Sequence, residues 1–553
     1  MSDQTSSSHR PKPPQFSRAG QSALVEARGQ IDSGPARRRQ SNRLPTGGLI
    51  ERAQTLTFTF DGQLYAGHPG DTLASALLAN GVHLVGRSFK YHRPRGILTA
   101  GPEEPNALVE LREGARREPN TRATTAELYD GLIAASQNRW PSLRCYLMAI
   151  NSLFAPIMSA GFYYKTFMWP AAFWEKVYEP MIRRAAGLGR AAGDADPDTY
   201  EKANLHCDVL VIGGGAAGLM AALAAGRTGL RVVLCEQDFR LGGRLIADNR
   251  VLNDRSSADW VAQMAAELAA LPDVRILLRS TVFGVYDHGT YAALERVNDH
   301  VAVPPEYEPR QRLWRIHARR CVLAAGAIER PLVFGDNDRP GVMLAGAVRT
   351  YLNRYAVAPG RRAVVFSTSD ETAATVSDLA RAGIAIAAVI DARGTVPPGI
   401  EVAARVAGAR LIAGGAIVRA LGRARVRAVA VRTATGATEQ IGSISSAFAG
   451  GGPHRSIWRR IWAAAPSGTI ASRPSFLLGC PTAWRWRAQP TANWRWRMRW
   501  PPGPPLALRL LISAAPLANP PKFPQRMARA LSTRRFGAFA PRVAKPSWIC
   551  KTM

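Results

Sequence analysis

Cysteine is scarce in this chain and never clustered. Its six cysteines are spread over 553 residues without a Cys-x-x-Cys pair (Cys145, Cys207, Cys235, Cys321, Cys480 and Cys550). Such spacing disfavours an iron–sulfur cluster, a metal site and a disulfide framework. Isolated thiols also fit a reducing compartment. We therefore expect a cytoplasmic protein without a metal site.

Long apolar runs and a secretory leader are lacking as well. The N-terminus has no apolar segment of the signal-peptide kind. The most aromatic stretch, FYYKTFMWPAAFWEKVYEP, is interrupted by Lys165, Glu175 and Lys176. Since a membrane helix needs about twenty mostly apolar residues, we expect no membrane span. With 46% hydrophobic residues, the chain can bury the cores of several domains.

Acidic residues are missing from the last fifth of the chain. From Gln440 to Met553 there are 18 Lys or Arg, no Asp or Glu, and eight of the 13 Trp. The formal net charge of +31 therefore comes largely from this segment. Alternating Trp and Arg, as in AWRWRAQPTANWRWRMRW, is a composition that can bind single-stranded nucleic acid. One hypothesis is thus a nucleic-acid-binding protein that uses its basic tail.

A shifted reading frame explains the same tail better. Trp-Arg repeats encoded as TGG CGC become Leu-Ala repeats when they are read from the preceding base. In that frame residues 472–499 can be read as AAFVPAGLPDGLALAGAADGKLALAHAL, which has an apolar helix and a glycine turn. We interpret 446–553 as a poorly ordered, out-of-frame segment after a frameshift near 440–447. We accordingly expect no nucleic-acid partner.

The N-terminal third predicts a small module behind a disordered tail. Residues 1–42 are rich in Ser, Pro and Arg, which is typical of disorder. In LTFTFDGQLYAG the dipeptide Asp61-Gly62 predicts a hairpin, and a helix capped by Asp71 and stopped at Gly81 follows. A hairpin followed by a helix indicates a β-grasp module of the ferredoxin type over 43–120.

The segment after this helix has an unexpected composition. It reads GRSFKYHRPRGILTAGPEEPN and contains no cysteine, so the module is predicted to lack a cluster. Its five basic residues face a partner subunit, an anionic cofactor or solvent (Arg87, Lys90, His92, Arg93 and Arg95). Residues 121–200 predict an aromatic-rich helical connector.

A dinucleotide-binding pattern follows in CDVLVIGGGAAGLMAALAAGRTGLRVVLCEQ. An apolar strand, Asp208–Ile212, leads into Gly213-x-Gly215-x-x-Gly218, then a helix and a second strand, Val232–Cys235, that ends at Glu236. The glycines permit the tight turn, the approach of a pyrophosphate, and close helix–strand packing. Glu236 is placed to accept hydrogen bonds from ribose hydroxyls, and its charge disfavours NADP.

Two later strings extend this region. LGGRL supplies Gly243 and Arg244, and a strand at Cys321–Ala324 ends in a turn at Gly326 like that between the two nucleotide domains of flavoproteins. RRAVVFSTSDETAATVSDLARAGIAIAAVIDAR then repeats the strand–helix–strand plan without the glycines and ends on Asp391. Residues 201–445 therefore predict an α/β fold of the Rossmann type with two dinucleotide domains. Its second half lies near 335–430.

Several strings together resemble one family over about residues 43–440. They are GDTLASALLANGV, GRSFKYHRPRGI, GPEEPNALVEL, SQNRWPSL, FYYKTFMWP, FWEKVYEP, VIGGGAAG, LGGRL and AAGAIERPLVFGDNDRPGVM. They resemble the alpha subunit of heterotetrameric sarcosine oxidase. The resemblance implies oxidative demethylation of sarcosine to glycine, hydrogen peroxide as a product, and tetrahydrofolate as the one-carbon acceptor.

The resemblance also implies cofactors and partners. NAD would lie on this chain at Gly213, Gly215, Gly218 and Glu236, with Gly243, Arg244 and Gly326 as further contacts; FAD is the alternative ligand. FAD and FMN belong to the implied complex, with beta, gamma and delta subunits as partners. The substrate-oxidising residues are on another subunit, so no catalytic residue is assigned. Because chains of that family are roughly twice as long, we expect a truncated subunit that is inactive alone.

A different interpretation is an independent or differently partnered amine oxidoreductase that uses NAD or FAD. Related opine-forming and cyanide-forming enzymes carry similar modules. Amine turnover by the isolated chain would distinguish this alternative from a subunit.

Overall fold

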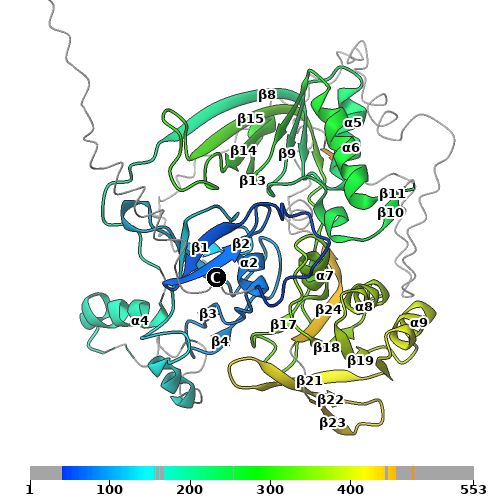
Figure 1. Cartoon of the computed structure of the whole chain (residues 1–553). Helices are drawn as coiled ribbons and strands as arrows, with labels where there is room; N and C mark the ends of the chain where they lie inside the picture. The colour runs from blue at the N-terminus through cyan, green and yellow to red at the C-terminus, as the bar shows by residue number, and fades with distance from the viewer. Residues whose placement is uncertain are drawn as a thin grey trace, which may run out of the picture.

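The computed structural model describes residues 40–154, 156, 161, 167, 169–187, 189–252, 254–442, 446–455 and 476–478. The predicted disordered tail 1–42 lies outside these residues except for 40–42, and so does most of 446–553. Within the described part, no helix is long and apolar enough to cross a membrane. Figure 1 shows the N-terminal module between two larger α/β bodies.

The N-terminal module is a five-stranded sheet in the order β2-β1-β7-β5-β6. β1 (Leu56–Phe60) and β2 (Gln63–Gly67) form the predicted hairpin. Asp61 and Gly62 both have positive φ, 53° and 75°, as a type I′ turn requires. The other strands are β5 (Leu108–Leu111), β6 (Glu118–Arg122) and β7 (Leu132–Ser136), and β7 runs parallel to β1. The predicted β-grasp arrangement is confirmed.

The module's helix, α2 (Leu73–Ala79), is buried along its whole length. Its cap is Thr72, whose hydroxyl accepts a hydrogen bond from the Ser75 N–H, and not Asp71 as predicted. Asp71 is fully buried because it binds the Arg43 guanidinium and the Ser75 hydroxyl instead. Gly81, with φ of 76°, follows the last turn as predicted.

The predicted module boundary at residue 120 is wrong. β6 and β7 continue the sheet to Ser136, so the segment 121–200 does not begin as a helical connector. The sequence concealed this because β7 pairs with β1, more than seventy residues earlier in the chain. The helical elements of the segment come later: η3 (Leu147–Phe154), η4 (Trp174–Tyr178) and α4 (Glu179–Ala186). β3 (Gly86–Arg87) and β4 (Pro94–Arg95) form a small separate hairpin.

The first nucleotide-type body has a sheet in the order β12-β9-β8-β15-β14-β13. Its centre is β8 (Tyr200–Ile212) running parallel to β15 (Gln311–Leu323). The remaining strands are β9 (Val232–Cys235), β12 (Val274–Leu277), β13 (Ser280–Tyr286) and β14 (Thr290–Glu295). α5 (Ala216–Gly226) and α6 (Ser257–Ala269) lie beside this sheet (Figure 1). Short elements are η5 (Gly243–Ala247), β10 (Val251–Leu252), β11 (Arg255–Ser256) and η6 (Asp287–Gly289).

The second body has a sheet in the order β16-β24-β18-β19-β20, with β17 paired to β24. Its strands are β16 (Ala327–Arg330), β17 (Val342–Met343), β18 (Arg362–Ser367), β19 (Ala385–Asp391), β20 (Arg410–Ala413) and β24 (Ser446–Arg455). Its helices are α7 (Ala345–Asn353), α8 (Thr372–Arg381) and α9 (Pro398–Val406). A meander of β21 (Ala416–Gly422), β22 (Val426–Arg432) and β23 (Thr438–Ile441) completes it. The predicted second half is thus a mostly parallel sheet with helices, in which β16 runs antiparallel to β24.

Two strands come from the segment that was expected to be poorly ordered. β24 runs parallel to β18, and β25 (Phe476–Leu478) runs parallel to the end of β15. The expectation is wrong for these two stretches, because in each sheet a strand leaves backbone groups with which a further parallel strand can pair. The rest of 446–553 lies outside the described residues.

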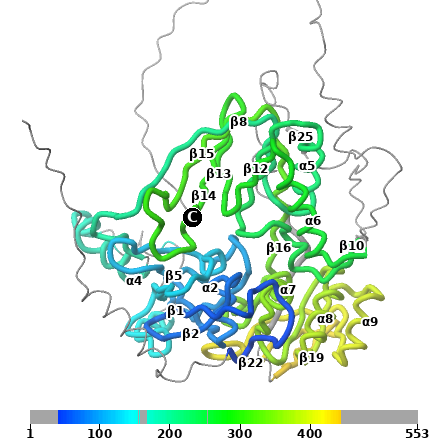
Figure 2. Tube along the Cα trace, turned by 45° about the horizontal axis from the view of Figure 1, so that its top comes forward, coloured from blue at the N-terminus to red at the C-terminus, as the bar shows by residue number. Residues whose placement is uncertain are grey.

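The module and the second body share one apolar core. It includes Leu73 and Leu77 of α2 together with Val348 and Tyr351 of α7. The Tyr351 hydroxyl also donates a hydrogen bond of 2.8 Å to the carbonyl of Thr99 in the module. Figure 2 shows α2 beside α7 from a second direction. The module is therefore fixed against the second body by packing, not by a flexible linker.

Candidate dinucleotide site

Two glycines of the motif are required by close backbone packing where β8 turns into α5. Gly213 has φ of 102°, and a Cβ there would lie 2.6 Å from the carbonyl oxygen of Ala324. A Cβ on Gly218 would lie 1.8 Å from the carbonyl oxygen of Gly213. Neither position has room for a side chain, as expected for the tight turn and for helix–strand packing.

The third glycine, Gly215, faces open space. It precedes the first turn of α5, and a Cβ built on it would have no neighbouring atom within 4 Å. The N–H groups at the start of a helix attract anions, and a bare backbone lets a pyrophosphate approach them. The structure therefore explains Gly215 by a ligand more readily than by packing within the chain.

Glu236 lies beside this turn at the end of β9. Its Oε2 accepts a hydrogen bond of 2.6 Å from the Gly214 N–H, and its Oε1 accepts one of 2.9 Å from the Asp238 N–H. The side chain is buried, and burial raises the pKa of its carboxyl against the opposing effect of these N–H donors. An ionised carboxylate has about four acceptor positions, so acceptor capacity remains for ribose hydroxyls.

The LGGRL loop lies along the motif, as predicted. The Gly242 N–H donates a hydrogen bond of 2.8 Å to the carbonyl of Gly214, and Gly215 pairs with Gly242 in a parallel bridge. A Cβ on Gly243 would lie 3.1 Å from the Cα of Gly215. Arg244 follows on the surface of η5. Gly243 thus belongs to the cradle, while Arg244 lies at its edge.

Gly326 lies where the chain leaves the first body. The Ala324 N–H donates to the carbonyl of Ile212, at the end of β8, and Gly326 follows two residues later with φ of 67°. Gly326 is exposed, and a Cβ there would have no neighbour within 4 Å. It therefore borders the glycine turn without forming part of its packing.

Three residues around this site escaped the sequence prediction. Gly214 and Gly242 hold the two loops together, and the double glycines in VIGGGAAG and LGGRL were the available signal. Asp238 accepts two hydrogen bonds from the buried Arg354, which fixes the loop after Glu236. Since these residues are more than a hundred positions apart, no local pattern could join them.

A half-buried carboxyl lies near Arg244. Glu329 in β16 accepts a hydrogen bond of 2.7 Å from the Gly346 N–H at the start of α7. Burial raises the pKa of Glu329 to about 7, although that N–H and the positive charge of Arg244 oppose the rise. The positive charge of Arg244 in the first body thus acts on the Glu329 carboxyl of the second body.

Among its described residues, the second body offers no equivalent cradle. Asp391, at the end of β19, is fully buried and receives two side-chain hydrogen bonds from Arg393. Arg393 also binds Asp370, which lies beside the start of α8 where a pyrophosphate would need positive potential. The acid that could hold a ribose is already neutralised, so these residues do not fit a second dinucleotide.

Two arginines of the basic loop are also neutralised within the chain. Arg93 binds Asp336 and Asp338, and Arg95 binds Asp338. These acids belong to the GDNDRPGVM string, so the ion pairs join the N-terminal module to the second body. Of the five basic residues of this loop, Arg93 and Arg95 therefore face acids of the same chain.

Together, a Rossmann half with an accessible glycine cradle and a second α/β half define an oxidoreductase of the two-dinucleotide-domain flavoprotein class. The family model described as "FAD dependent oxidoreductase" matches residues 208–293, and the model described as "2Fe-2S iron-sulfur cluster binding domain" matches 53–139. Among individual proteins, sarcosine oxidase subunit alpha of Rhizobium meliloti (strain 1021) is 53% identical over 411 residues, which are 74% of this chain and 41% of that protein.

A second relative has the same name. Sarcosine oxidase subunit alpha of Corynebacterium sp. (strain U-96) is 38% identical over 354 residues, or 63% of this chain and 31% of that protein. The chain is therefore a homologue of sarcosine oxidase alpha subunits and spans about two fifths or less of their length. Among solved structures, L-proline dehydrogenase from P. horikoshii matches with a TM-score of 0.47 and 21% identity, over 74% of this chain and 62% of that one.

The cluster named by the first family model does not fit this chain. A [2Fe–2S] cluster is held by cysteine thiolates, and residues 53–139 contain none; the first cysteine is Cys145. The β-grasp fold is therefore present without cysteine ligands for a cluster within the matched residues.

Proposed function

We propose that this chain is the NAD-binding alpha-subunit part of a sarcosine oxidase complex. That complex oxidatively demethylates sarcosine to glycine, forms hydrogen peroxide, and transfers the one-carbon unit to tetrahydrofolate. Beta, gamma and delta subunits would be its partners, with FAD and FMN in the complex as a whole. The similarity to two sarcosine oxidase alpha subunits supports this assignment.

One observation carries the choice of a dinucleotide with free ribose hydroxyls, such as NAD and unlike NADP: the Glu236 carboxylate lies beside the Gly214 N–H, next to the open face of Gly215. Gly213, Gly215, Gly218 and Gly243 would border the pyrophosphate, and Glu236 would accept the ribose hydroxyls. Arg244 and Gly326 would lie toward the far end of the ligand. When bound, NAD supplies a site that can take up or release hydride; the residues of this chain bind and orient it.

The direct test is equilibrium binding of NAD, NADP and FAD to the purified full chain by isothermal titration calorimetry. NAD should bind at one site per chain, and NADP at least about tenfold more weakly because the Glu236 carboxylate repels a 2′-phosphate. Glu236→Gln should reduce this discrimination, whereas Glu267→Gln, at a half-buried position of α6 where the carboxylate binds Arg227, should not. A tightly held flavin that copurifies with the chain would refute NAD as the ligand of this cradle.

The activity requires a second experiment. Coexpression with partner subunits of a sarcosine oxidase should yield a complex that forms hydrogen peroxide only when sarcosine is added. The isolated chain should show no amine turnover. Amine-dependent turnover by the isolated chain would instead support an independent amine oxidoreductase.

A further inference from the structure

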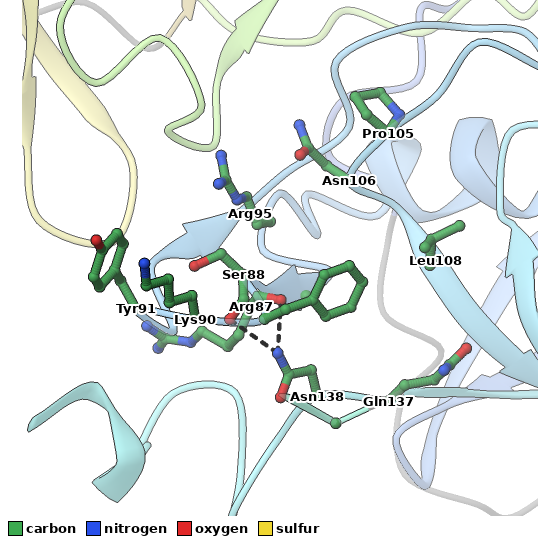
Figure 3. Close-up of a pocket in the computed structure, with 13 residues that line it drawn as sticks. Arg87, Ser88, Lys90, Tyr91, Arg95, Pro105, Asn106, Leu108, Gln137 and Asn138 are labelled. Atoms are coloured by element: carbon green, nitrogen blue, oxygen red, sulfur yellow. Dashed lines mark hydrogen bonds between the residues drawn. The ribbon is translucent and has the colours of Figure 1, made fainter. Parts of the chain in front are cut away.

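A cavity of about 290 Å³ lies in the basic loop of the N-terminal module, away from the residues of the glycine cradle. It is lined by Gly86, Arg87, Ser88, Phe89, Lys90, Tyr91, Arg95, Pro105, Asn106, Leu108, Gln137, Asn138 and Gly187. Figure 3 shows Arg95 and Asn106 on one side of this space and Gln137 and Asn138 on the other. Most of its lining residues belong to the segment after α2, where ferredoxins hold their iron–sulfur cluster and this chain has no cysteine. None of its lining residues was assigned a role by the proposed function.

The charge of the lining is of one sign. Arg87, Lys90 and Arg95 carry positive charge, and the described residues that line the cavity include no Asp or Glu, although Arg95 is paired with Asp338 outside this lining. A neighbouring cavity of about 420 Å³ shows the contrast, because there Asp336 and Asp338 neutralise the arginines. The smaller cavity therefore has an excess of positive potential.

Arg87 is held by neutral groups. Its guanidinium donates to the carbonyls of His92 and Leu143 and lies 5.0 Å from the centre of the Tyr146 ring. Its buried Nε has no hydrogen-bond partner among the described residues, and burial lowers its pKa. A guanidinium in such surroundings is stabilised when an anion approaches.

The loop is fixed in shape around this charge. The Asn138 side-chain amide donates 3.0 Å hydrogen bonds to the carbonyls of Arg87 and Ser88, which Figure 3 marks as dashed lines. Asn106 and Gln137 bring further amide groups to the lining. Phe89 is 46% exposed in the same lining, so an apolar surface accompanies the cations.

We propose that this cavity binds a small organic phosphate, with the phosphate near Lys90, Arg87 and Arg95 and its apolar part against Phe89. A phosphate monoester carries about −1.5 to −2 charges near pH 7 and therefore matches the charges of Arg87 and Lys90 better than a monoanion does. The volume is close to the lower limit of about 300 Å³ that is usual for small-molecule sites. A compact ligand is therefore expected, not a complete dinucleotide.

The experiment is calorimetric titration of the full chain with phenyl phosphate, inorganic phosphate and benzoate at constant ionic strength. Gly215→Asp serves as the background variant, since its carboxylate repels phosphate from the dinucleotide cradle. Phenyl phosphate should bind saturably at one site, several-fold more tightly than either other probe. In this background Lys90→Glu should weaken it at least about tenfold, while Lys90→Arg should stay within about threefold of Lys90.

The matched control is Lys202→Glu, which makes the same charge change on the exposed surface of β8 and should leave the affinity unaltered. Three results would overturn the proposal. They are equal losses in Lys90→Glu and Lys202→Glu, no saturable binding in the Gly215→Asp background, and benzoate binding as tightly as phenyl phosphate. The last of these would assign the cavity to carboxylates.

Discussion

An added methyl group should have different effects at the two motif glycines: at Gly218 it should lower stability, and at Gly215 it should lower the affinity for NAD. In Gly218→Ala the new Cβ would lie 1.8 Å from the Gly213 carbonyl oxygen, so the backbone of the turn has to move. Overpacking of this kind costs about 3 kcal/mol of unfolding free energy when backbone atoms are in the way. In a body of this size that corresponds to a fall of roughly 6–12 °C in Tm.

Gly215→Ala adds the methyl group to open space. Gly215 has φ of −73° and ψ of −177°, which alanine adopts without strain. The free energy of unfolding should therefore change by only about 0.5 kcal/mol, since a small loss of helix capping opposes the entropic gain of replacing glycine. The affinity for NAD should nevertheless fall about tenfold or more, because the methyl group occupies the approach of the pyrophosphate.

The assay is thermal unfolding of each variant without ligand, followed by NAD titration at a temperature where both are folded. Gly229→Ala, at a turn with φ of 76°, is a control for glycine replacement outside the cradle. It should lose stability from backbone strain while keeping its NAD affinity. If Gly215→Ala destabilises the chain as much as Gly218→Ala does, or binds NAD normally, the open face of Gly215 is not the ligand site.

Further predictions concern the ion pairs, one carboxyl and the thiols. Arg354→Lys should lower the free energy of unfolding in denaturant by about 1–3 kcal/mol and weaken NAD binding, because lysine cannot make both hydrogen bonds to Asp238. An unchanged free energy of unfolding and an unchanged NAD affinity would refute this. Asp338→Asn should lower the free energy of unfolding by only about 1 kcal/mol, because its ion-pair partners Arg93 and Arg95 are partly exposed to solvent. Glu329 has a pKa raised to about 7 from 4.5, so wild-type stability should fall between pH 4.5 and 7 and level off above, and Glu329→Gln should lack this fall. If the stability of the wild type and of Glu329→Gln fell equally between pH 4.5 and 7, Glu329 would not be the titrating group. In native labelling with iodoacetamide, Cys145 should react, whereas the buried Cys207, Cys235 and Cys321 should react only after unfolding; peptide mass spectrometry measures this.

Local patterns predicted the parts of the fold that local chemistry determines. The hairpin at Asp61-Gly62, the strand Val232–Cys235 and the glycine turn at Gly213 each depend on neighbouring residues, and the structure contains all three. The predictions that were wrong concern contacts between residues that are distant in the sequence. β7 was missed because its partner strand β1 is distant in sequence, and the cap was misplaced because Asp71 is committed to Arg43.

The candidate site divides in the same way. Its glycines and Glu236 lie within one strand–helix–strand unit, so their spacing revealed them. The charges that support and surround it come from elsewhere: Arg354 donates hydrogen bonds to Asp238, and the charge of Arg244 lowers the pKa of Glu329. Pairing at this distance depends on how the bodies pack, which a single sequence does not display.

The basic loop shows why composition alone misleads about partners. Five basic residues in a short segment suggested one electrostatic surface, but burial lowers the pKa of His92, and the structure divides the four Arg and Lys side chains between two uses. Arg93 and Arg95 are bound to acids of the second body, more than two hundred residues later, and so contribute to domain packing. Arg87 and Lys90 line a cavity in which no described lining residue is acidic, and Arg95 borders it as well. The basic loop therefore joins the N-terminal module to the second body through Arg93 and Arg95, and it gives the cavity a positive potential through Arg87 and Lys90. Only the positive potential of the cavity can select an anionic ligand.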